Sequence, residues 1–352
     1  MAIIDKPSDY FNTKLYTGTG SSNSVTGVGF QPDFTWVKAR GNTTWHYLYD
    51  AVRTAGTGKE LHSNSTASEG ASNSSLYGYL SSFNSDGFST VIGSNASSDG
   101  LNKSGTDFAS WNWKANGAGS ANTDGTISST VSANTTSGFS IVKYTGNGSA
   151  GATIGHGLGS APSAIFVKGT SLVSDWSSYH SVLGNTGYMR LNNSNAFATA
   201  STYWNNTSPD NDVFTVGTTG NINGSGNTYI AYCFHSVQGY SKFGSYTGNG
   251  NADGTFVYTG FKPAFIICKI TSGTSNWRMF DNKRLGYNVD NNPLYPNVTN
   301  VEGTEDNIDI LSNGFKWRTT DGALNGSGSS YIYMAFAKAP LVGSNNVPCT
   351  AR

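Results

Sequence analysis

The chain contains three copies of one sequence pattern, and this repetition constrains the fold more than any other feature. Each copy opens on Tyr-Thr-Gly-x-Gly, at Tyr16–Gly20, Tyr144–Gly148 and Tyr246–Gly250. Each copy closes on an aromatic stretch, so the three span residues 16–113, 144–234 and 246–336. A unit of roughly 90 residues is longer than a solenoid repeat of about 20–45 residues. It is long enough to own a hydrophobic core, as a β-sandwich of about 100 residues does.

The second landmark of each copy is a Pro-containing turn that leads into a strand. It lies at Gly29–Lys38 and Gly260–Lys269, and in a longer form at Gly157–Lys168. Proline has no backbone N–H and therefore favours the start of a strand. In the third copy this strand contains Phe265–Cys268, whose apolar residues on both faces predict burial on both faces. Each strand ends in a lysine whose ammonium group we expect to reach water. These lysines are Lys38, Lys168 and Lys269.

Turn and strand residues make up most of the remainder of each copy. The pairs Asp86-Gly87 and Asn313-Gly314 are typical of turns that close β-hairpins. The closing aromatic stretches predict strands in the densest part of each core. They are Phe108–Trp113, Tyr229–Phe234 and Tyr331–Phe336. We identify no convincing amphipathic helix, so the sequence predicts an all-β protein.

The composition agrees with a folded, weakly charged protein. Aromatic residues make up 13% of the 352 residues, which argues against wholesale disorder. Lys and Arg together number 21, as do Asp and Glu, so the formal net charge is zero. A nucleic-acid-binding protein would normally carry a basic excess, and we expect no nucleic-acid partner. Only 12% of the residues are charged, against about 25% in ordinary soluble domains. This suits a protein that packs against others.

We predict three tandem β-sandwich modules: module one at 1–117, module two at 118–240 and module three at 241–352. The Gly/Ala/Ser/Asn-rich segment 115–123 predicts a flexible joint. The short connection at 236–241 predicts that modules two and three dock on each other. The terminal segments 1–10 and 341–352 fit no module. They are either arms that lie on a neighbouring subunit or frayed ends, with about equal weight.

The sequence offers few residues for chemistry. The three cysteines, Cys233, Cys268 and Cys349, are too few and odd in number for a disulfide scaffold. No histidine has a partner at zinc-ligand spacing, and no nucleophile elbow, phosphate loop or dinucleotide motif is visible. We therefore expect no cofactor, no metal and no catalytic residue. Without a visible signal peptide or membrane span, we expect synthesis in a reducing cytoplasm.

One aromatic cluster in module one is a candidate glycan-binding site. Its residues are Trp45, His46, Tyr47, Asp50 and Arg53. The sequence comparison of the copies aligns Trp45 with Trp277 and, more loosely, with Trp176. Aromatic rings beside polar groups are what sugar sites use, because the faces of sugars stack on rings. The alternative, which we favour, is that Trp45, Tyr47 and Tyr49 alternate along a strand and face one core.

The only acidic cluster is Glu302–Asp309 in module three. Clustered carboxylates suit a hydrolase site, which needs two of them, or a calcium loop. The cluster lacks the spacing of a calcium hand, and it has no sequence counterpart in the other copies. We therefore favour a solvated loop.

Several stretches resemble a repeat found in structural and tail-fibre proteins of marine tailed bacteriophages. They are Phe30–Lys38, Leu48–Arg53, Ser85–Phe88, Trp111–Lys114 and Val347–Arg352. The resemblance covers nearly the whole chain and is weakest in module two. It implies jelly-roll, concanavalin A-like modules and a virion component without enzymatic activity. It implies no particular sugar-binding residues.

The sequence thus leads to a non-enzymatic virion surface protein, made in the host cytoplasm, either a capsid decoration or a tail or fibre component. We expect it to pack against other virion proteins, in many copies or as a homo-oligomer, without inserting into a membrane. The absence of a trimerising shaft favours a globular decoration or adaptor over a fibre. One alternative is a lectin-like protein that attaches to host surface glycans. Another, less favoured, is a polysaccharide depolymerase acting through Glu302 and Glu305.

Overall fold

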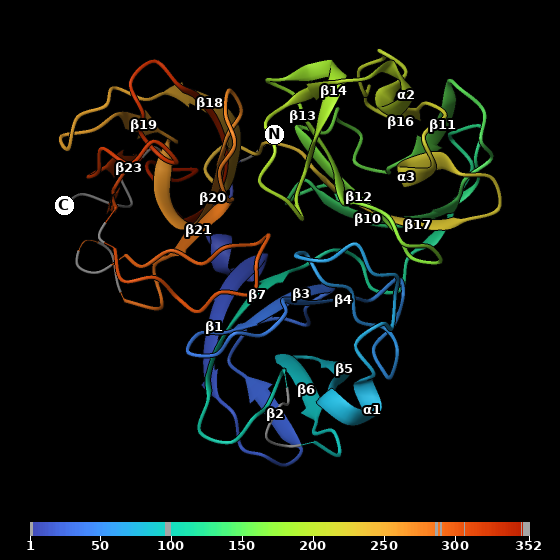
Figure 1. The fold of residues 1–352 in the computed structure, drawn as a ribbon, viewed down its shortest axis with the longest axis horizontal. Coiled ribbons are helices and arrows are strands. Elements are labelled where there is room, and N and C mark those ends of the chain that lie inside the picture. The colour runs from blue at the N-terminus through green and yellow to red at the C-terminus, as the bar shows by residue number, and fades with distance from the viewer. Residues whose placement is uncertain are drawn as a thin grey trace.

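The computed structural model describes residues 3–95, 100–285, 288, 291–305, 307–345 and 347. As predicted, the chain is all-β (Figure 1). Its described helices are single turns: η1 (Pro7–Asp9), α1 (Ser74–Tyr77), α2 (Ser201–Trp204) and α3 (Gly220–Asn223). No helix in the described residues is long and apolar enough to cross a membrane.

Module one contains two antiparallel sheets. The first has the strand order β1-β7-β3-β4 and the second the order β2-β6-β5. The first sheet comprises β1 (Phe11–Thr17), β3 (Phe34–Ala39), β4 (Tyr47–Asp50) and β7 (Asp107–Trp113). The second comprises β2 (Asn23–Thr26), β5 (Tyr79–Asn84) and β6 (Gly87–Val91).

Module two has a wider first sheet. Its order is β15-β14-β13-β12-β17-β10-β9-β8, and the second sheet pairs β11 with β16. The first sheet comprises β8 (Ser120–Asn122), β9 (Ser129–Asn134), β10 (Phe139–Thr145), β12 (Ala164–Gly169), β13 (Ser177–His180), β14 (Gly184–Arg190), β15 (Ala198–Thr199) and β17 (Thr228–Phe234). The second comprises β11 (Ala152–Gly155) and β16 (Val213–Val216).

Module three returns to the pattern of module one. Its sheets have the orders β18-β24-β20-β21 and β19-β23-β22. The first comprises β18 (Ser241–Thr247), β20 (Phe261–Ile270), β21 (Arg278–Asp281) and β24 (Ser330–Pro340). The second comprises β19 (Phe256–Tyr258), β22 (Ile308–Leu311) and β23 (Gly314–Trp317).

The sequence repeat is therefore also a repeat of topology. The orders β1-β7-β3-β4, β10-β17-β12-β13 and β18-β24-β20-β21 place equivalent segments side by side. The opening Tyr-Thr-Gly strand pairs with the closing aromatic strand of its own copy, as Tyr16 does with Phe108. The two sheets of each copy enclose a core, which gives each copy a β-sandwich-like character.

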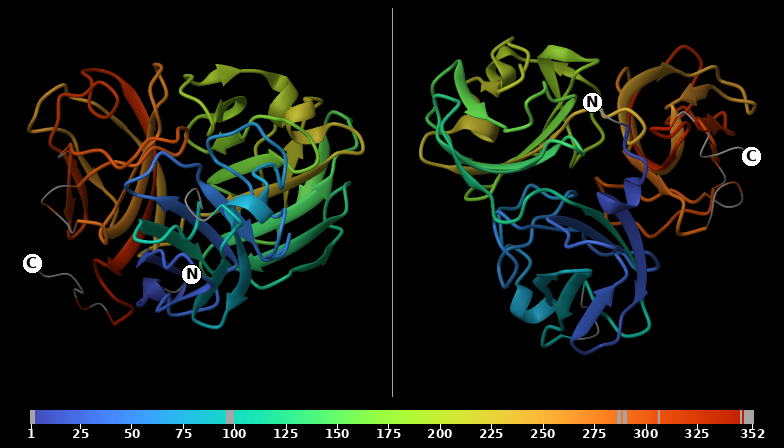
Figure 2. Two further views of the ribbon diagram at one scale, coloured as in Figure 1. Left: turned by 60° about the horizontal axis from the view of Figure 1, so that its bottom comes forward. Right: turned by 180° about the vertical axis from the view of Figure 1, so that it is seen from behind.

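The three copies surround a fourth, shared core (Figures 1 and 2). It joins aromatic residues of all three modules, and the ring of Phe11 stacks on Phe336 with centroids 5.3 Å apart. The ring centroids of Phe34 and Tyr232 lie 4.3 Å apart, with the two rings tilted against each other. The closing strands alternate between two cores: in β17, Tyr232 points to the shared core and Cys233 to the core of module two.

This shared core explains why Phe265–Cys268 is apolar on both faces, as predicted. Phe265 and Ile267 belong to the shared core, whereas Ile266 and Cys268 belong to the core of module three. A strand that is buried on both faces loses the alternation of apolar and polar residues.

The predicted hairpin turns are confirmed. Asn84 pairs with Gly87 and Leu311 pairs with Gly314, so each turn has two central residues. A Cβ atom on Gly87 would collide with the carbonyl oxygen of Val25 on the neighbouring strand β2. Glycine is therefore required there by the close approach of the two backbones.

The predicted flexible joint is instead held in place. The carboxylate of Asp33 accepts hydrogen bonds from the backbone N–H of Ala115, at 2.7 Å, and of Gly117, at 3.2 Å. Residues 120–122 form strand β8, which pairs with β9. A Gly/Ser/Asn-rich composition predicts flexibility only where no neighbouring group is available to bind the backbone.

The N-terminal segment packs on its own chain, which corrects the prediction of an arm on a neighbour or a frayed end. Ile4 and Pro7 are buried, and the ring of Tyr10 meets Tyr240 edge-on at 6.0 Å. The carboxylate of Asp5 accepts a hydrogen bond of 2.7 Å from the backbone N–H of Ser344. Asp5 and Ser344, near the two ends of the chain, thus meet beside module three, whereas residues 1 and 2 of the predicted N-terminal arm lie outside the described residues. Of the predicted C-terminal arm, residues 346 and 348–352, with Cys349, lie outside the described residues.

Candidate functional site: the contacts between modules

Three equivalent lysines are buried, contrary to the prediction that their ammonium groups reach water. Lys38, Lys168 and Lys269 have no exposed surface. Each ammonium group donates to backbone carbonyl oxygens, and Lys168 Nζ reaches Ser174 at 2.6 Å and Thr66 of module one at 2.8 Å. Burial lowers the pKa of Lys38 and of Lys168 to about 7, and that of Lys269 to about 8. The loop that follows each strand folds back over the lysine, which sequence periodicity does not reveal.

The residue two places after each lysine marks the first repeated contact between modules. Its carbonyl oxygen accepts a hydrogen bond from a backbone N–H of the next module in a closed ring. The three bonds are Glu69 N to Thr170 O (3.0 Å), Phe197 N to Thr271 O (3.1 Å) and Glu302 N to Arg40 O (2.8 Å). The fixed offset from the lysines is the sequence signal that could have found these acceptors.

A ring N–H makes the second repeated contact. It donates to a backbone carbonyl of another module at all three junctions. The bonds are Trp176 Nε1 to His62 O (2.8 Å), Trp277 Nε1 to Arg190 O (2.9 Å) and His46 Nε2 to Tyr295 O (2.9 Å). The Nδ1 atom of His46 accepts from Trp36 Nε1 at 2.9 Å, so in the neutral ring Nε2 carries the proton. Burial lowers the pKa of His46 well below its usual value and keeps this ring neutral.

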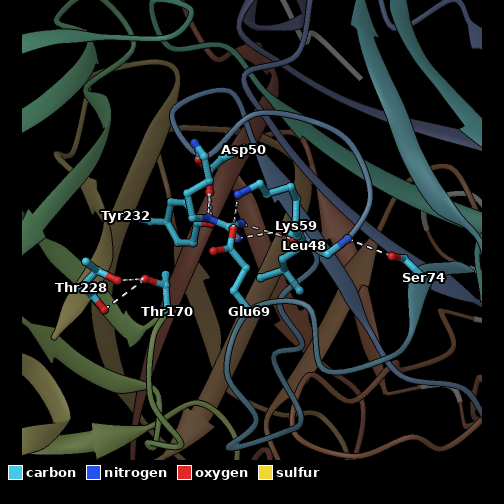
Figure 3. A network of polar contacts seen from close by, with 10 residues as sticks. Leu48, Asp50, Lys59, Glu69, Ser74, Thr170, Thr228 and Tyr232 are labelled. Atoms are coloured by element: carbon cyan, nitrogen blue, oxygen red, sulfur yellow. Dashed lines mark hydrogen bonds and ion pairs between the residues drawn. The ribbon is translucent and has the colours of Figure 1, made fainter.

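The third contact, between modules one and two, is an ionic network around Asp50 (Figure 3). The Asp50 carboxylate binds Arg53 Nε at 2.6 Å and accepts from the hydroxyl of Tyr232 at 2.7 Å. Arg53 also reaches Glu69 at 3.1 Å. Burial by itself lowers the pKa of Arg53, but the charge of Asp50 and its neighbours outweighs burial and raises it. The guanidinium therefore stays charged.

The same network recurs where module three meets module one. Asp281 binds Arg284 Nε at 2.7 Å and accepts from Trp111 Nε1 at 3.1 Å. Trp111 lies on β7 as Tyr232 lies on β17, and each belongs to the shared core. Arg284 approaches Glu302 at 3.3 Å, as Arg53 approaches Glu69.

The contact between modules two and three is mostly apolar. His180 takes the position of Asp50, because Ala164 pairs with His180 as Phe34 pairs with Asp50. Its Nε2 meets the carbonyl oxygen of Tyr333 at 3.3 Å. Leu183 takes the position of Arg53, and Met334 takes the position of Tyr232. Both residues line a small cavity together with His180.

The structure separates the five candidate glycan-binding residues. His46, Tyr47, Asp50 and Arg53 are buried, and all except Tyr47 take part in the junction contacts given above. Trp45 alone is half-buried at the surface. The favoured arrangement is confirmed for Tyr47 and Tyr49, which share the core of module one, and the half-buried Trp45 packs against the same core.

The strand register also corrects the alignment of the repeats by one residue. The backbone N–H groups of His46, Trp176 and Trp277 each donate to the Oδ1 atom of an asparagine. These acceptors are Asn64, Asn192 and Asn297. His46 is therefore the counterpart of the two buried tryptophans. Trp45, which the sequence alone aligns with them, lies where the other copies have Asp175 and Asn276.

One residue of the acidic cluster, Glu302, has a counterpart after all, and Asp306 of the cluster lies outside the described residues. Glu302 lies in the place of Glu69, and its carboxylate is shared between Arg40, at 2.7 Å, and Arg284. The sequence comparison missed this because the two segments share no motif, only a place in the junction. Arg40, Glu302 and Thr304 are among the residues that line an open cleft of about 460 Å³. Glu305 is not among the residues that line this cleft.

Other candidate groups lie in the cores. Cys233 and Cys268 are fully buried, and burial raises the pKa of both thiols, that of Cys268 to about 12. Within the described part of the chain, no three His, Cys, Asp or Glu side chains are grouped so as to hold a metal ion.

Comparison with known families gives one match. A family model described as "Domain of unknown function (DUF7483)" matches residues 6–340, which include all three repeats. The searches of curated proteins and of solved structures found no match.

Proposed function

The chain belongs to this DUF7483 family, and we propose that it is a non-enzymatic structural protein on the surface of a tailed-phage particle. In this proposal each of the three modules is a jelly-roll, concanavalin A-like β-sandwich. The protein acts by packing against other virion proteins. Its resemblance to marine phage structural repeats supports this assignment, together with the geometry of the junctions.

The observation that carries the proposal is the closed ring of modules. The backbone contact and the ring N–H contact each occur at all three junctions. A shared aromatic core fills the centre. One chain thus forms a body with threefold pseudosymmetry, which otherwise takes three subunits. A stiff, pre-assembled unit loses little conformational freedom when it docks on a particle.

The titratable groups at the junctions support a structural role. Asp50, Asp281 and Glu302 each pair with a buried or half-buried arginine. His46 and His180 are nearly or fully buried and bind backbone carbonyls. Groups held in this way stabilise one arrangement of the modules.

Copy number in purified particles tests the proposal. Quantitative mass spectrometry against the major capsid protein should detect the chain as a virion component. Hundreds of copies would place it on the capsid. A count between about three and about eighteen would place it in a tail with small cyclic symmetry. Complete absence from particles would overturn the proposal.

The ring itself has a separate test. Because the modules share a core, the full chain should unfold in one cooperative calorimetric transition. Modules that behave as beads on a string would give separable transitions, and this result would contradict a rigid body.

A further inference from the structure

We propose that module one binds a neutral saccharide in a groove beside Trp45. This inference is independent of the virion assignment, because it rests on one local site. It also changes the candidate site predicted from the sequence: Trp45 and Tyr47 remain, whereas His46, Asp50 and Arg53 are replaced by residues of a neighbouring loop.

The first observation is that Trp45 is an additional aromatic residue. At the equivalent position the other modules carry the polar residues Asp175 and Asn276. The structural role of the repeat tryptophans is taken in module one by His46, whose N–H groups make both repeated contacts. Trp45 is therefore not needed to hold the ring of modules together, although its ring packs against His62 at 4.4 Å.

The second observation is an open groove at this position, with a volume of about 500 Å³. Thr43, Thr44 and Trp45 line it from the loop before β4. The second lining segment is 71–77, which ends in α1 and contributes Asn73. The nearly buried Tyr47 completes the lining.

Hydrogen bonds to two buried side chains hold both lining segments in place. Lys38 Nζ donates to the carbonyl of Asn42 at 2.9 Å and reaches the Thr44 hydroxyl at 3.4 Å. The buried carboxylate of Glu60 accepts from the hydroxyl of Ser72 at 2.7 Å and from its backbone N–H at 3.2 Å. A site whose walls are fixed before binding pays less ordering entropy when a ligand arrives.

The lining determines the kind of ligand. Among the described residues it contains the aromatic rings of Trp45, Tyr47 and Tyr77, together with hydroxyl and amide groups, and no charged side chain. The C–H face of a pyranose packs on an aromatic ring, while its hydroxyls pair with Ser, Thr and Asn. A charged ligand would find no countercharge among these described lining residues. The volume falls within the range of about 300–1,000 Å³ that is usual for small-ligand sites.

The test uses the full chain with 15N-labelled tryptophans and four neutral disaccharides: maltose, lactose, cellobiose and N,N'-diacetylchitobiose. The indole signal of Trp45 is identified as the one missing in Trp45→Phe. At least one disaccharide should shift this signal saturably. Trp45→Ala should weaken that affinity by about tenfold or more, because the stacking surface is lost. Tyr77→Ala should weaken it as well.

Tyr258→Ala is the matched control, because Tyr258 is an aromatic residue of module three that is 51% exposed. It should bind the disaccharide as the unmodified chain does. Unfolding midpoints of all variants separate lost binding from lost folding. The proposal fails if no disaccharide shifts the Trp45 signal, or if Trp45→Ala binds with unchanged affinity. Neither result alters the copy number that tests the virion assignment.

Discussion

The junction between modules one and two and the junction between modules two and three use the same positions with different chemistry. The first places an aspartate, an arginine and a tyrosine hydroxyl at these positions, and the second a histidine, a leucine and a methionine. The sets are Asp50, Arg53 and Tyr232 against His180, Leu183 and Met334. The three residues change together, because a buried carboxylate without its arginine would be an uncompensated charge.

The difference shows which contacts fix the geometry. The backbone bonds from Glu69 to Thr170 and from Phe197 to Thr271 are the same in both junctions. They require no particular side chain, so the side chains around them are free to be ionic or apolar. Three junctions of unequal chemistry also favour one order of modules around the ring.

The largest expected effect follows from removing one half of the ionic pair. Asp50→Ala leaves Arg53 buried without its main partner and should lower the free energy of unfolding by about 3–5 kcal/mol. Chemical denaturation of the full chain measures this loss. Asp253→Ala removes an aspartate whose side chain is 70% exposed and should lower the free energy of unfolding far less. Equal losses in the two variants would show that the Asp50 network adds nothing specific.

At the mostly apolar junction between modules two and three, the free energy of unfolding should depend on pH. Burial lowers the pKa of His180 to about 4, below its usual value of 6.5. Between these pH values the unfolded chain takes up a proton that the folded chain does not, so stability is lost as the pH falls. In His180→Asn, denaturation between pH 7 and 4 should show a loss smaller by roughly 2–3 kcal/mol. An unchanged pH dependence would contradict the burial of a neutral imidazole.

The buried Lys168, which bonds across the junction between modules one and two, should matter to a smaller degree. Lys168→Met keeps the side chain length but leaves the carbonyls of Thr66 and Ser174 without a donor. This should cost about 1–3 kcal/mol. Lys143→Met is the control, because Lys143 lies on β10 of the same module with its side chain exposed. Denaturation midpoints that match in the two variants would refute a structural role for the buried ammonium group.

The smallest change in stability is expected when all three residues of the ionic set are replaced together. Replacing Asp50, Arg53 and Tyr232 by His, Leu and Met transfers the apolar set to the ionic junction. Removing both charges together leaves neither one unpaired, so the change in stability should stay within about 1.5 kcal/mol. A loss as large as that of Asp50→Ala would show that the surrounding shape, and not the charge, decides the junction.

Local features of the fold could be predicted from the sequence because they depend on near neighbours. The hairpins at Gly87 and Gly314 follow from turn chemistry, and the doubly apolar strand at Phe265–Cys268 follows from its composition. The prediction of a flexible joint at 115–123 is wrong, because Asp33 holds this segment in place. Asp33 lies far from the segment in the sequence, so local composition does not reveal this contact.

The same distinction between local and long-range features applies to the candidate glycan-binding site. Trp45 and Tyr47 were identified from aromatic composition, and both line the groove. The alignment of Trp45 with the repeat tryptophans was off by one residue, because only the pairing of β3 with β4 fixes the register. Tyr77 and Asn73 belong to a segment without a repeat signal, so the sequence alone did not bring them to the site.

The all-β character and the threefold repeat can be recognised in the amino-acid sequence alone, because strand periodicity and turn residues act over short distances. The closure of the copies into a ring around a shared core depends instead on contacts between segments far apart in the chain. The acceptors of this ring are backbone carbonyls, and any residue type provides one. Whether Lys38 meets water or carbonyl oxygens, and whether Glu302 is free or paired, therefore depends on which segments meet in space.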